Sequence, residues 1–511
     1  MKAKINRRTF LGSAAASTAA FTILPRHALG GPGYVAPSDK ITLAYIGVGT
    51  QGLREMVTLL PNPNVRIVAV CDPNKDSANY VDWSKNGIRD SIRKVLENPT
   101  WGEGVNGIRG GREVGREIVD TYYGNLGFPD SLGSCASYAD FRELLEKEKD
   151  LDAVKIMTPD HLHATIAIAA MKKGKSVLMH KPIANRLAES RMVIETARQT
   201  KVATHFLPWN NGNSIRQIAA WIKDGAIGTL REVHNWSSRP MWPQYSTIPT
   251  ETPPIPKDFD WDLWLGPALY RPYHPNYTHA VFRGWYDFGG GSLADMGHYS
   301  LWSVFTVFNL GAPISVEATP THTCALVDQV SVRQKNDYSF PAACTIRFKF
   351  AARGDRPPFD IIWYDGGIRP STPEELDVDN KEMPGEGMMF VGDKGKILAD
   401  FRGRNPHIIP EKKMREYQGV EQTAQVTPQP EAGGQATPND RDKEWVEAFK
   451  GGAPSAGNFL NATAISDAIN LGAVALRVGK RILFDAENMK ITNIPEANKY
   501  LYREYRKGWE L

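Results

Sequence analysis

The sequence predicts an α/β protein in two parts: a doubly wound parallel sheet of the Rossmann type, then an α+β domain on a large, mostly antiparallel sheet. From Ile41 to about residue 206, short apolar runs alternate with helical patterns, which is typical of a parallel sheet covered on both faces. Beyond Trp209, polar and apolar residues alternate within strand-length runs, which indicates antiparallel strands. A chain of 511 residues is also too long for one core.

The first 28 residues have the features of an export signal. Arg7 and Arg8 precede Phe10 and Leu11, and an Ala/Ser/Thr-rich run extends to Leu24. Paired arginines before such a run indicate the twin-arginine route and a periplasmic location; a disordered start with two chance arginines is the alternative. We expect a signal peptide (1–28), a Gly/Pro-rich linker (29–39), a nucleotide-binding domain (40–208) and a substrate-binding domain with C-terminal helices (209–511).

The stretch from Ile41 to Asp72 indicates a dinucleotide site. An apolar strand leads into a glycine-rich turn and a helix, and a second strand ends at Asp72. Gly47 would allow the tight turn, Gly49 would let the backbone approach a pyrophosphate, and Gly52 would let helix and strand pack closely. Thr50 and Gln51 complete the turn at the helix N-terminus, which favours phosphate. The Asp72 carboxylate would accept the ribose hydroxyls and repel a 2′-phosphate, so NAD is favoured over NADP.

Charge and cysteine content exclude several classes of partner. The formal charge of +4 is misleading, because residues 1–28 carry five basic residues and no acid, leaving 56 basic against 57 acidic residues. Such a balance gives no reason to expect nucleic acid or an anionic membrane as a partner. After the signal, no stretch reads as long and apolar enough to span a bilayer. The four cysteines lack metal-type spacing, and neither a metal site nor a disulfide framework is expected.

Residues 74–133 interrupt the alternation of strands and helices. Helical patterns around residues 88–96 and 113–122 flank a glycine-rich stretch. The segment is either a solvated insertion, a loop over the cofactor or an oligomer contact, and the sequence does not choose among these. In the second half we expect helices at 214–224, 293–308, 440–450 and 462–482, and an irregular surface stretch at 402–438.

Lys181 is the strongest catalytic candidate. It directly follows an apolar strand, so it lies at the carboxyl edge of the parallel sheet, where such folds place their ligands. Thr158 and Pro159 follow the preceding strand and reach the same edge. Oxidising an alcohol requires a group that takes the hydroxyl proton, and a lysine near a cationic nicotinamide would have a lowered pKa. A solvated lysine before a proline is the alternative.

A second cluster follows three consecutive glycines at 289–291. Asp295 lies about one helical turn before both His298 and Tyr299, so it can share a helix face with either. A helix cap with a hydrogen-bonded core histidine is an equally good interpretation of this cluster.

Taken together, these motifs resemble the Gfo/Idh/MocA oxidoreductases over nearly all of residues 40–400. The resemblance rests on GVGTQG, the TPDHLH stretch with His163, the HKP motif and GGGSLADMGHY. It implies a Rossmann domain, a second domain on a large antiparallel sheet, NAD(P), and a sugar or polyol substrate. It also implies that Lys181 and Asp295 are the catalytic lysine and its acid.

Two positions depart from that family's pattern. The glutamate that commonly precedes the Lys-Pro pair is His180 here, so its usual contact near the nicotinamide is in question. The family's histidine four residues after the aspartate is Tyr299 here, with His298 one residue earlier; both are candidates, and His298 is slightly preferred.

Aromatic and polar side chains of the second domain suit a polyhydroxylated ring, although each could equally be a core residue. The candidates are Trp209, Asn210, Tyr273, His274, His279, Arg283, Trp285 and Asp287, with Asp295 and His298. We therefore predict an exported NAD-dependent oxidoreductase acting on a ring hydroxyl of a sugar or glycoside, with a homo-oligomer as a candidate assembly. The alternatives are a glycosidase that retains NAD and uses transient oxidation with elimination, and a non-catalytic nucleotide- or sugar-binding protein.

Overall fold

The computed structural model describes residues 35–127, 134–418 and 438–511, and residues 41–511 form one compact unit. Residues 35–40 fall in a separate unit and include a 3-10 turn, η1 (Pro37–Asp39). The predicted signal peptide and most of the linker lie outside the described residues.

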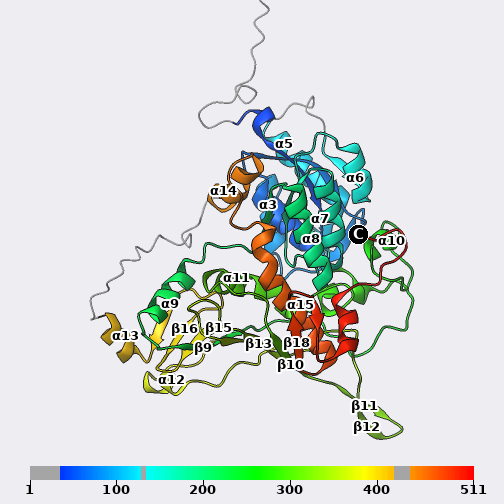
Figure 1. Cartoon of the computed structure of the whole chain (residues 1–511). Helices are drawn as coiled ribbons and strands as arrows, with labels where there is room; N and C mark the ends of the chain where they lie inside the picture. The colour runs from blue at the N-terminus through cyan, green and yellow to red at the C-terminus, as the bar shows by residue number, and fades with distance from the viewer. Residues whose placement is uncertain (1–34, 128–133, 419–437) are drawn as a thin grey trace, which may run out of the picture. The chain divides into compact units, whose positions relative to one another are not determined.

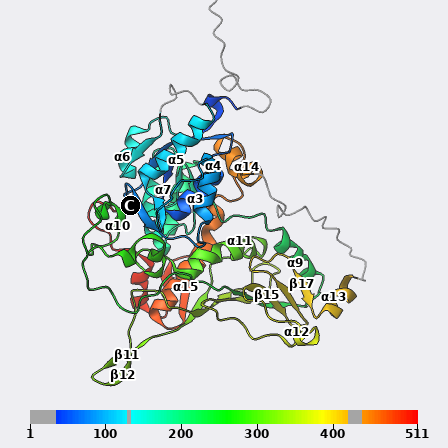
Figure 2. The ribbon, with the colours of Figure 1, turned by 180° about the vertical axis from the view of Figure 1, so that it is seen from behind.

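The first half forms the predicted parallel sheet, with six strands that all run the same way (Figures 1 and 2). In spatial order they are β5 (Ala136–Tyr138), β2 (Val65–Cys71), β1 (Ile41–Ile46), β6 (Ala153–Ile156), β7 (Ser176–Met179) and β8 (Thr204–Phe206). The connecting helices include α3 (Thr50–Leu59), α5 (Arg112–Asn125), α6 (Phe141–Lys147), η3 (Asp160–Leu162), α7 (His163–Lys172) and α8 (Leu187–Thr200). Strand β1 is almost wholly buried, because both faces of such a sheet are covered.

The segment predicted as an insertion forms structure of its own. It contains a short antiparallel pair, β3 (Ser77–Tyr80) with β4 (Ile108–Gly110), and the helices α4 (Gly87–Leu96) and α5. Both predicted helices are confirmed. On α4, Ile88, Ile92 and Leu96 are buried at intervals of four, so the helix packs one apolar face against the domain.

The second half contains a nine-stranded sheet. Its order is β17 (His407–Ile409), β16 (Lys396–Ala399), β15 (Gly387–Gly392), β9 (Leu230–Trp236), β14 (Phe359–Tyr364), β13 (Cys344–Phe350), β10 (Ser315–Pro320), β18 (Ile482–Asp485) and β19 (Lys490–Ile491). Among these strands only β9 and β14 pair in parallel, so the mostly antiparallel prediction is confirmed.

Helix α15 (Thr463–Val478) packs on β10 and β13, and α11 (His298–Val307) packs on both α15 and α9 (Asn213–Lys223). The remaining elements are α10 (Trp261–Leu265), α12 (Glu374–Val378), α13 (Glu411–Gln418), α14 (Pro438–Phe449), the π-helical turn η6 (Leu293–Gly297) and the 3-10 turns η4 (Pro275–Tyr277), η5 (His279–Gly284), η7 (Phe459–Ala462) and η8 (Pro495–Leu501).

Helix α14 returns from the second half of the chain to the first sheet. Trp445 is buried in the core beside α3 and α5, and Asn62 donates a hydrogen bond to Asp442 (3.0 Å). The predicted domain boundary at residue 208/209 stays a prediction, because α14 of the second half packs on the first sheet and residues 41–511 form one compact unit.

Three predictions about the second half are wrong in detail. Within 402–438, the described residues form β17 and α13 rather than irregular chain; 419–437 lie outside the described residues. The last helix ends at Val478, because Gly479 adopts a left-handed conformation (φ +65°), and Ile482 starts β18. Among the described residues, one helical segment, Phe459–Val478, is long and apolar enough to cross a membrane, but 72% of its 18-residue apolar window is buried in the fold, as in a core helix.

One hairpin projects away from the rest of the second half (Figures 1 and 2). It consists of β11 (Cys324–Val327) and β12 (Val330–Arg333), and it pairs with no other sheet. Leu326, Val327 and Val330 are exposed on it. These apolar side chains therefore contribute little to the core of the single chain.

Candidate active site

The glycine turn after β1 has the geometry that its sequence predicts. Gly47 has φ +97°, and a Cβ there would lie 2.6 Å from the Met157 carbonyl group. A Cβ on Gly52 would lie 2.2 Å from the Gly47 carbonyl oxygen. A Cβ on Gly49 would lie 2.9 Å from the Tyr80 ring. Each position therefore requires glycine for space. Helix α3 begins at Thr50, directly after Gly49, and no side chain caps its N-terminus, so N–H groups there can bind phosphate.

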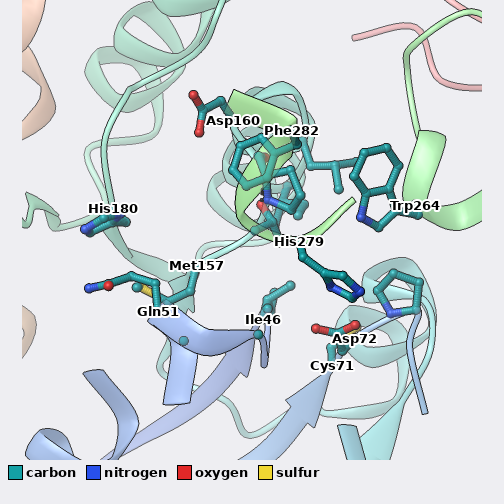
Figure 3. A pocket seen from close by; sticks show the side chains of 18 of the residues that line it. Ile46, Gln51, Cys71, Asp72, Met157, Asp160, His180, Trp264, His279 and Phe282 are labelled. Carbon is teal, nitrogen blue, oxygen red and sulfur yellow. Dashed lines mark hydrogen bonds between the residues drawn. The ribbon is translucent and has the colours of Figure 1, made fainter. Parts of the chain in front are cut away.

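A pocket opens along the carboxyl edge of the parallel sheet, with about 1120 Å³ of empty space including its open mouth. It brings together nearly all the predicted cofactor residues: Gly47, Gly49, Thr50, Gln51, Gly52, Asp72, Thr158, Pro159, His180 and Lys181. Figure 3 shows His180 and Asp72 at opposite sides of this space. An elongated ligand can thus reach from the end of β2 to the end of β7.

Asp72 lies at the end of β2, as predicted. One of its carboxylate oxygens accepts the Val48 backbone N–H (2.7 Å) and the other accepts the Asn74 N–H (2.8 Å). Burial raises its pKa to about 6, although both hydrogen bonds act in the opposite direction. A carboxylate has about four acceptor positions, so each oxygen retains one for a ribose hydroxyl.

Lys181 and Asp295 meet at the other end of the pocket. They form a buried ion pair across 114 residues of chain, and Arg283 Nε lies 3.3 Å from the same Asp295 oxygen without aligning for a hydrogen bond. Burial lowers the pKa of Lys181, and Asp295 opposes this only in part because Arg283 repels the ammonium. Burial would raise the pKa of Asp295, but the two cations outweigh it and lower that pKa. The pair therefore favours an ionised aspartate beside a lysine that loses its proton more readily than usual.

Tyr299, rather than His298, joins this group. Its hydroxyl lies 2.7 Å from His180 Nε2, and Lys181 Nζ lies 5.8 Å from its ring centre. The pKa of His180 is well below its usual value because the ring is buried beside Lys181 and Arg283, so neutral His180 can accept the Tyr299 proton in this bond. The departures from the family pattern at His180 and Tyr299 thus form a hydrogen-bonded pair.

His298 is fully buried and does not line the pocket. One ring nitrogen bonds the Ala294 carbonyl (3.0 Å), the other has no partner among the described residues, and burial lowers its pKa to about 3. Tyr299 is thus the candidate that contacts His180 and Lys181, and the slight sequence preference for His298 as the catalytic residue stays a prediction.

His163 is buried next to the site and does not line the pocket. Its two ring nitrogens lie 2.6 Å from the Pro182 carbonyl oxygen and 3.0 Å from the Thr158 carbonyl oxygen, and burial lowers its pKa, so the neutral ring donates its single N–H to one of them. The ring thus lies between the lysine loop and the loop after β6, and its role in cofactor binding stays a prediction.

Several predicted substrate residues lie elsewhere. Trp285 is fully buried, donates to the Asn276 carbonyl (2.7 Å) and stacks on Tyr245. Trp209 packs against His205, and Asn210 is exposed and accepts the Gly212 N–H (3.1 Å). The structure thus gives these three side chains roles in aromatic packing and turn capping outside the pocket, and their role in substrate binding stays a prediction.

The other candidates divide between pocket and scaffold. Arg283 and His279 line the pocket, and burial lowers the pKa of His279 to about 4. Asp287 instead pairs with Arg186 (3.3 Å) and Arg271, outside the pocket. Of these, Tyr273, His274 and Asp287 do not line this pocket. Asp295 and Tyr299 do not line it either; they bond to Lys181 and His180, which do.

The structure adds residues that the sequence did not single out. Asp160, in the same loop as Pro159, is buried and accepts the Gly290 N–H (3.0 Å), so it fixes the triple-glycine loop beside the site. Tyr80 and Trp83 come from the 74–133 segment and line the pocket, which favours its interpretation as a cofactor loop. Trp264 and Trp509 line it as well. Among the described residues, no three His, Cys, Asp or Glu side chains gather as metal ligands. All four cysteines are free.

The chain thus combines a parallel sheet that carries a glycine-turn pocket with a second, mostly antiparallel sheet, and the pocket ends at Lys181, which pairs with Asp295. Residues 126–206 match a family profile described as oxidoreductase family, NAD-binding Rossmann fold, and residues 214–359 match the oxidoreductase family's C-terminal alpha/beta domain. Both profiles are those of the Gfo/Idh/MocA family, and together they match less than half of the chain. The first domain is an NAD-binding Rossmann domain.

Individual relatives are distant. A levoglucosan dehydrogenase from Pseudarthrobacter phenanthrenivorans is 31% identical over 114 residues, which cover 21% of this chain and 29% of that protein. An alpha-N-acetylgalactosaminidase from Shewanella oneidensis is 24% identical over 242 residues, 44% of each chain. The matched regions thus span less than half the length of these relatives. The WlbA dehydrogenase from Chromobacterium violaceum, solved with NADH and UDP-GlcNAcA, superposes with a TM-score of 0.49 at 15% identity, covering 88% of this chain and 97% of that one.

Proposed function

We propose that this protein is an NAD-dependent oxidoreductase that transfers hydride between a ring hydroxyl of a sugar or glycoside and nicotinamide. The observation that carries this proposal is the Lys181–Asp295 pair at one end of a pocket whose other end is the glycine turn with Asp72. Acid–base chemistry and nucleotide recognition therefore share one cavity.

The chemistry divides between cofactor and chain. NAD, when bound, supplies the acceptor for the hydride that leaves the carbinol carbon. Lys181 Nζ takes the hydroxyl proton as the C–H bond breaks, so the alcohol becomes a ketone and the lysine becomes an ammonium. Asp295 holds the lysine in place, and its carboxylate stabilises the ammonium that forms; Arg283 lies beside the same carboxylate.

The pocket fits NAD better than NADP. Asp72 lines the pocket and offers acceptors to a ribose diol. A 2′-phosphate at the same place would meet the carboxylate charge in a buried site.

The sugar class is supported by pocket chemistry and by distant relatives. Arg283 and His279 present donors and acceptors beside the ring of Phe282, which suits a polyhydroxylated molecule. One similar protein bears the name levoglucosan dehydrogenase.

Replacing the lysine tests this proposal. Lys181→Met should still bind NAD, because the glycine turn is intact, but turnover should fall by about two to four orders of magnitude. The matched control is Lys172→Met at an exposed lysine on α7, which should keep wild-type turnover. Binding is measured by titration with NAD, and turnover by NADH absorbance with analysis of the keto product on a panel of sugars. Full activity of Lys181→Met would remove the lysine from the mechanism.

A second candidate is a glycosidase that retains NAD and regenerates it in each cycle. It is favoured by the similarity to an alpha-N-acetylgalactosaminidase and to proteins named glycosyl hydrolase family 109, all near 24% identity. A dehydrogenase using free cofactor yields one NADH and one keto sugar per turnover, with the glycosidic bond intact. Release of aglycone without net oxidation would establish the glycosidase instead. Tightly held cofactor could hide NADH, so both products must be assayed.

The non-catalytic alternative is disfavoured by the buried lysine–aspartate pair, which a binding protein does not need.

We also propose export by the twin-arginine route. In fractionated cells, Arg7→Lys with Arg8→Lys should leave the protein in the cytoplasm, because the receptor reads paired arginines. Periplasmic delivery of that variant would indicate another route, and homo-oligomerisation stays a prediction.

A further inference from the structure

The segment Arg503–Leu511 reaches from the large-sheet domain to the wall of the cofactor pocket. It follows η8, and Trp509 near its end lines the pocket together with Phe141, at the start of α6. In Figure 1 the labelled chain end lies beside α10 and close to α6. A segment distant in sequence from the Rossmann sheet therefore completes its ligand site.

Arg503 fixes the start of this segment. Its guanidinium forms an ion pair with Glu189 (2.6 Å), and both side chains are at most 4% exposed. It also donates to Asn185 and to the Asp287 carbonyl (3.2 Å). The anchor thus joins the loop after Lys181 to the loop that precedes Asp295.

Arg506 fixes the middle of the segment. It donates to the Gly266 carbonyl (3.0 Å) and the Asp262 carbonyl (2.7 Å), and it forms an ion pair with the Asp262 side chain. Asp262 and Gly266 lie in and just after α10, whose Leu263 and Trp264 also line the pocket. Two arginines therefore fix the backbone that leads to Trp509.

Trp509 is held with its ring in the pocket wall. It is 6% exposed, its ring centre lies 6.2 Å from that of Phe141, and the Arg142 guanidinium lies 4.3 Å from the ring centre. Phe141, which contacts Trp509, is not next to β7, the strand that precedes Lys181. Phe141 follows β5, which is the neighbour of β2 and its Asp72, whereas Lys181 follows β7 on the other side of β1. A dinucleotide with its ribose diol on Asp72 would place its adenosine half at this end.

We propose that Trp509 is a cofactor-binding residue that forms the wall against the adenosine half of NAD, with Arg503 and Arg506 positioning it. This inference rests on the proposed function, because it requires that the pocket takes NAD. A flat indole beside an adenine gives contact area at little entropic cost, and a base stacked on an aromatic ring is stabilised substantially. The 503–511 segment thereby couples tight cofactor binding to the second domain.

The test uses the full chain and two probes, NAD and ADP-ribose, which lacks the nicotinamide. Trp509→Ala should weaken both ligands equally, by about 5- to 100-fold in Kd by calorimetry. In turnover assays the KM for NAD should rise while kcat at saturating NAD stays the same. The matched control is Tyr502→Ala, an exposed aromatic just before the segment, which should bind both probes as wild type does.

Each outcome separates the two proposals. A wild-type protein that binds neither probe contradicts the proposed function itself. Wild-type affinity of Trp509→Ala for ADP-ribose overturns the present inference, and so does a loss confined to NAD, because the residue would then contact the other half. If Trp509→Ala does not fold, Trp509→Leu keeps an apolar contact with Phe141 and is tested in the same way. Hydrogen exchange of residues 503–511 in the wild type should slow when ADP-ribose is added, and unchanged exchange would also overturn the inference.

Discussion

At the scale of single residues, Asp72 links cofactor binding to pH. Its buried carboxyl has a pKa of about 6, above the ordinary value for aspartate. The folded protein therefore binds this proton more tightly than the unfolded chain. This group's contribution favours the folded state most below about pH 4 and is lost as pH rises through 6. Cofactor binding requires the opposite state, because the charged carboxylate is the stronger acceptor for ribose hydroxyls.

We expect the affinity for NAD to fall as pH is lowered from 7.5 to 5, with most of the change near pH 6. Titration of NAD at a series of pH values measures this. Asp72→Asn serves as the control, since its affinity should be lower, independent of pH over that range and closer to its affinity for NADP. An NAD affinity that varies with pH equally in both proteins would assign the effect to another group.

At the scale of elements, the turn between β1 and α3 depends on a strand pair from the 74–133 segment. The Tyr80 ring sits against Gly49, its hydroxyl accepts a hydrogen bond from Asn74 (3.1 Å), and its ring centre lies 4.1 Å from that of His279. The ring is therefore held on several sides and cannot easily give way.

Gly49→Ala should reduce the affinity for NAD by tenfold or more, because the new methyl group meets the Tyr80 ring at 2.9 Å. Gly124→Ala on α5 is the matched control, since a Cβ there meets nothing within 4 Å. Its affinity should be unchanged and its stability equal or up to about 1 kcal/mol higher, as for glycine to alanine in a helix. Calorimetric titration and thermal unfolding of both variants check this, and an unaffected Gly49→Ala would show that the ring does yield.

At the scale of the whole molecule, buried ion pairs connect parts of the chain that are far apart in sequence. Arg503 and Glu189 are separated by 314 residues, and Arg191 similarly pairs with the buried Asp467 of α15. Removing one partner of such a pair leaves the other charge buried without compensation, which is costly.

Glu189→Gln should lower the free energy of unfolding by about 3–5 kcal/mol, as for other broken buried pairs. Glu143→Gln removes the partner of exposed Lys147 on α6 and should cost at most about 1 kcal/mol. Denaturant unfolding of both variants measures the difference. Equal effects would mean that solvent reaches Arg503 in the folded protein.

The sequence by itself determined the features that depend on local patterns. Apolar periodicity and the positions of glycine and aspartate were enough to predict the parallel sheet, the turn at Gly47–Gly52 and the placement of Lys181. In a parallel sheet, the residue after each strand must reach the same edge, so Lys181 and Thr158 could be placed together without knowing any long-range contact.

Only the tertiary structure decided which aromatic residues belong to the pocket. Trp285 and Trp509 are the same residue type in similarly polar surroundings, yet one is buried among Tyr245 and Tyr277 and the other lines the cofactor site. The return of α14 to the first sheet and the hydrogen bond of Tyr299 to His180 could not be predicted from the sequence either. The physical reason is that burial and contact between segments hundreds of residues apart depend on how whole elements pack, and no local pattern in the chain records that packing.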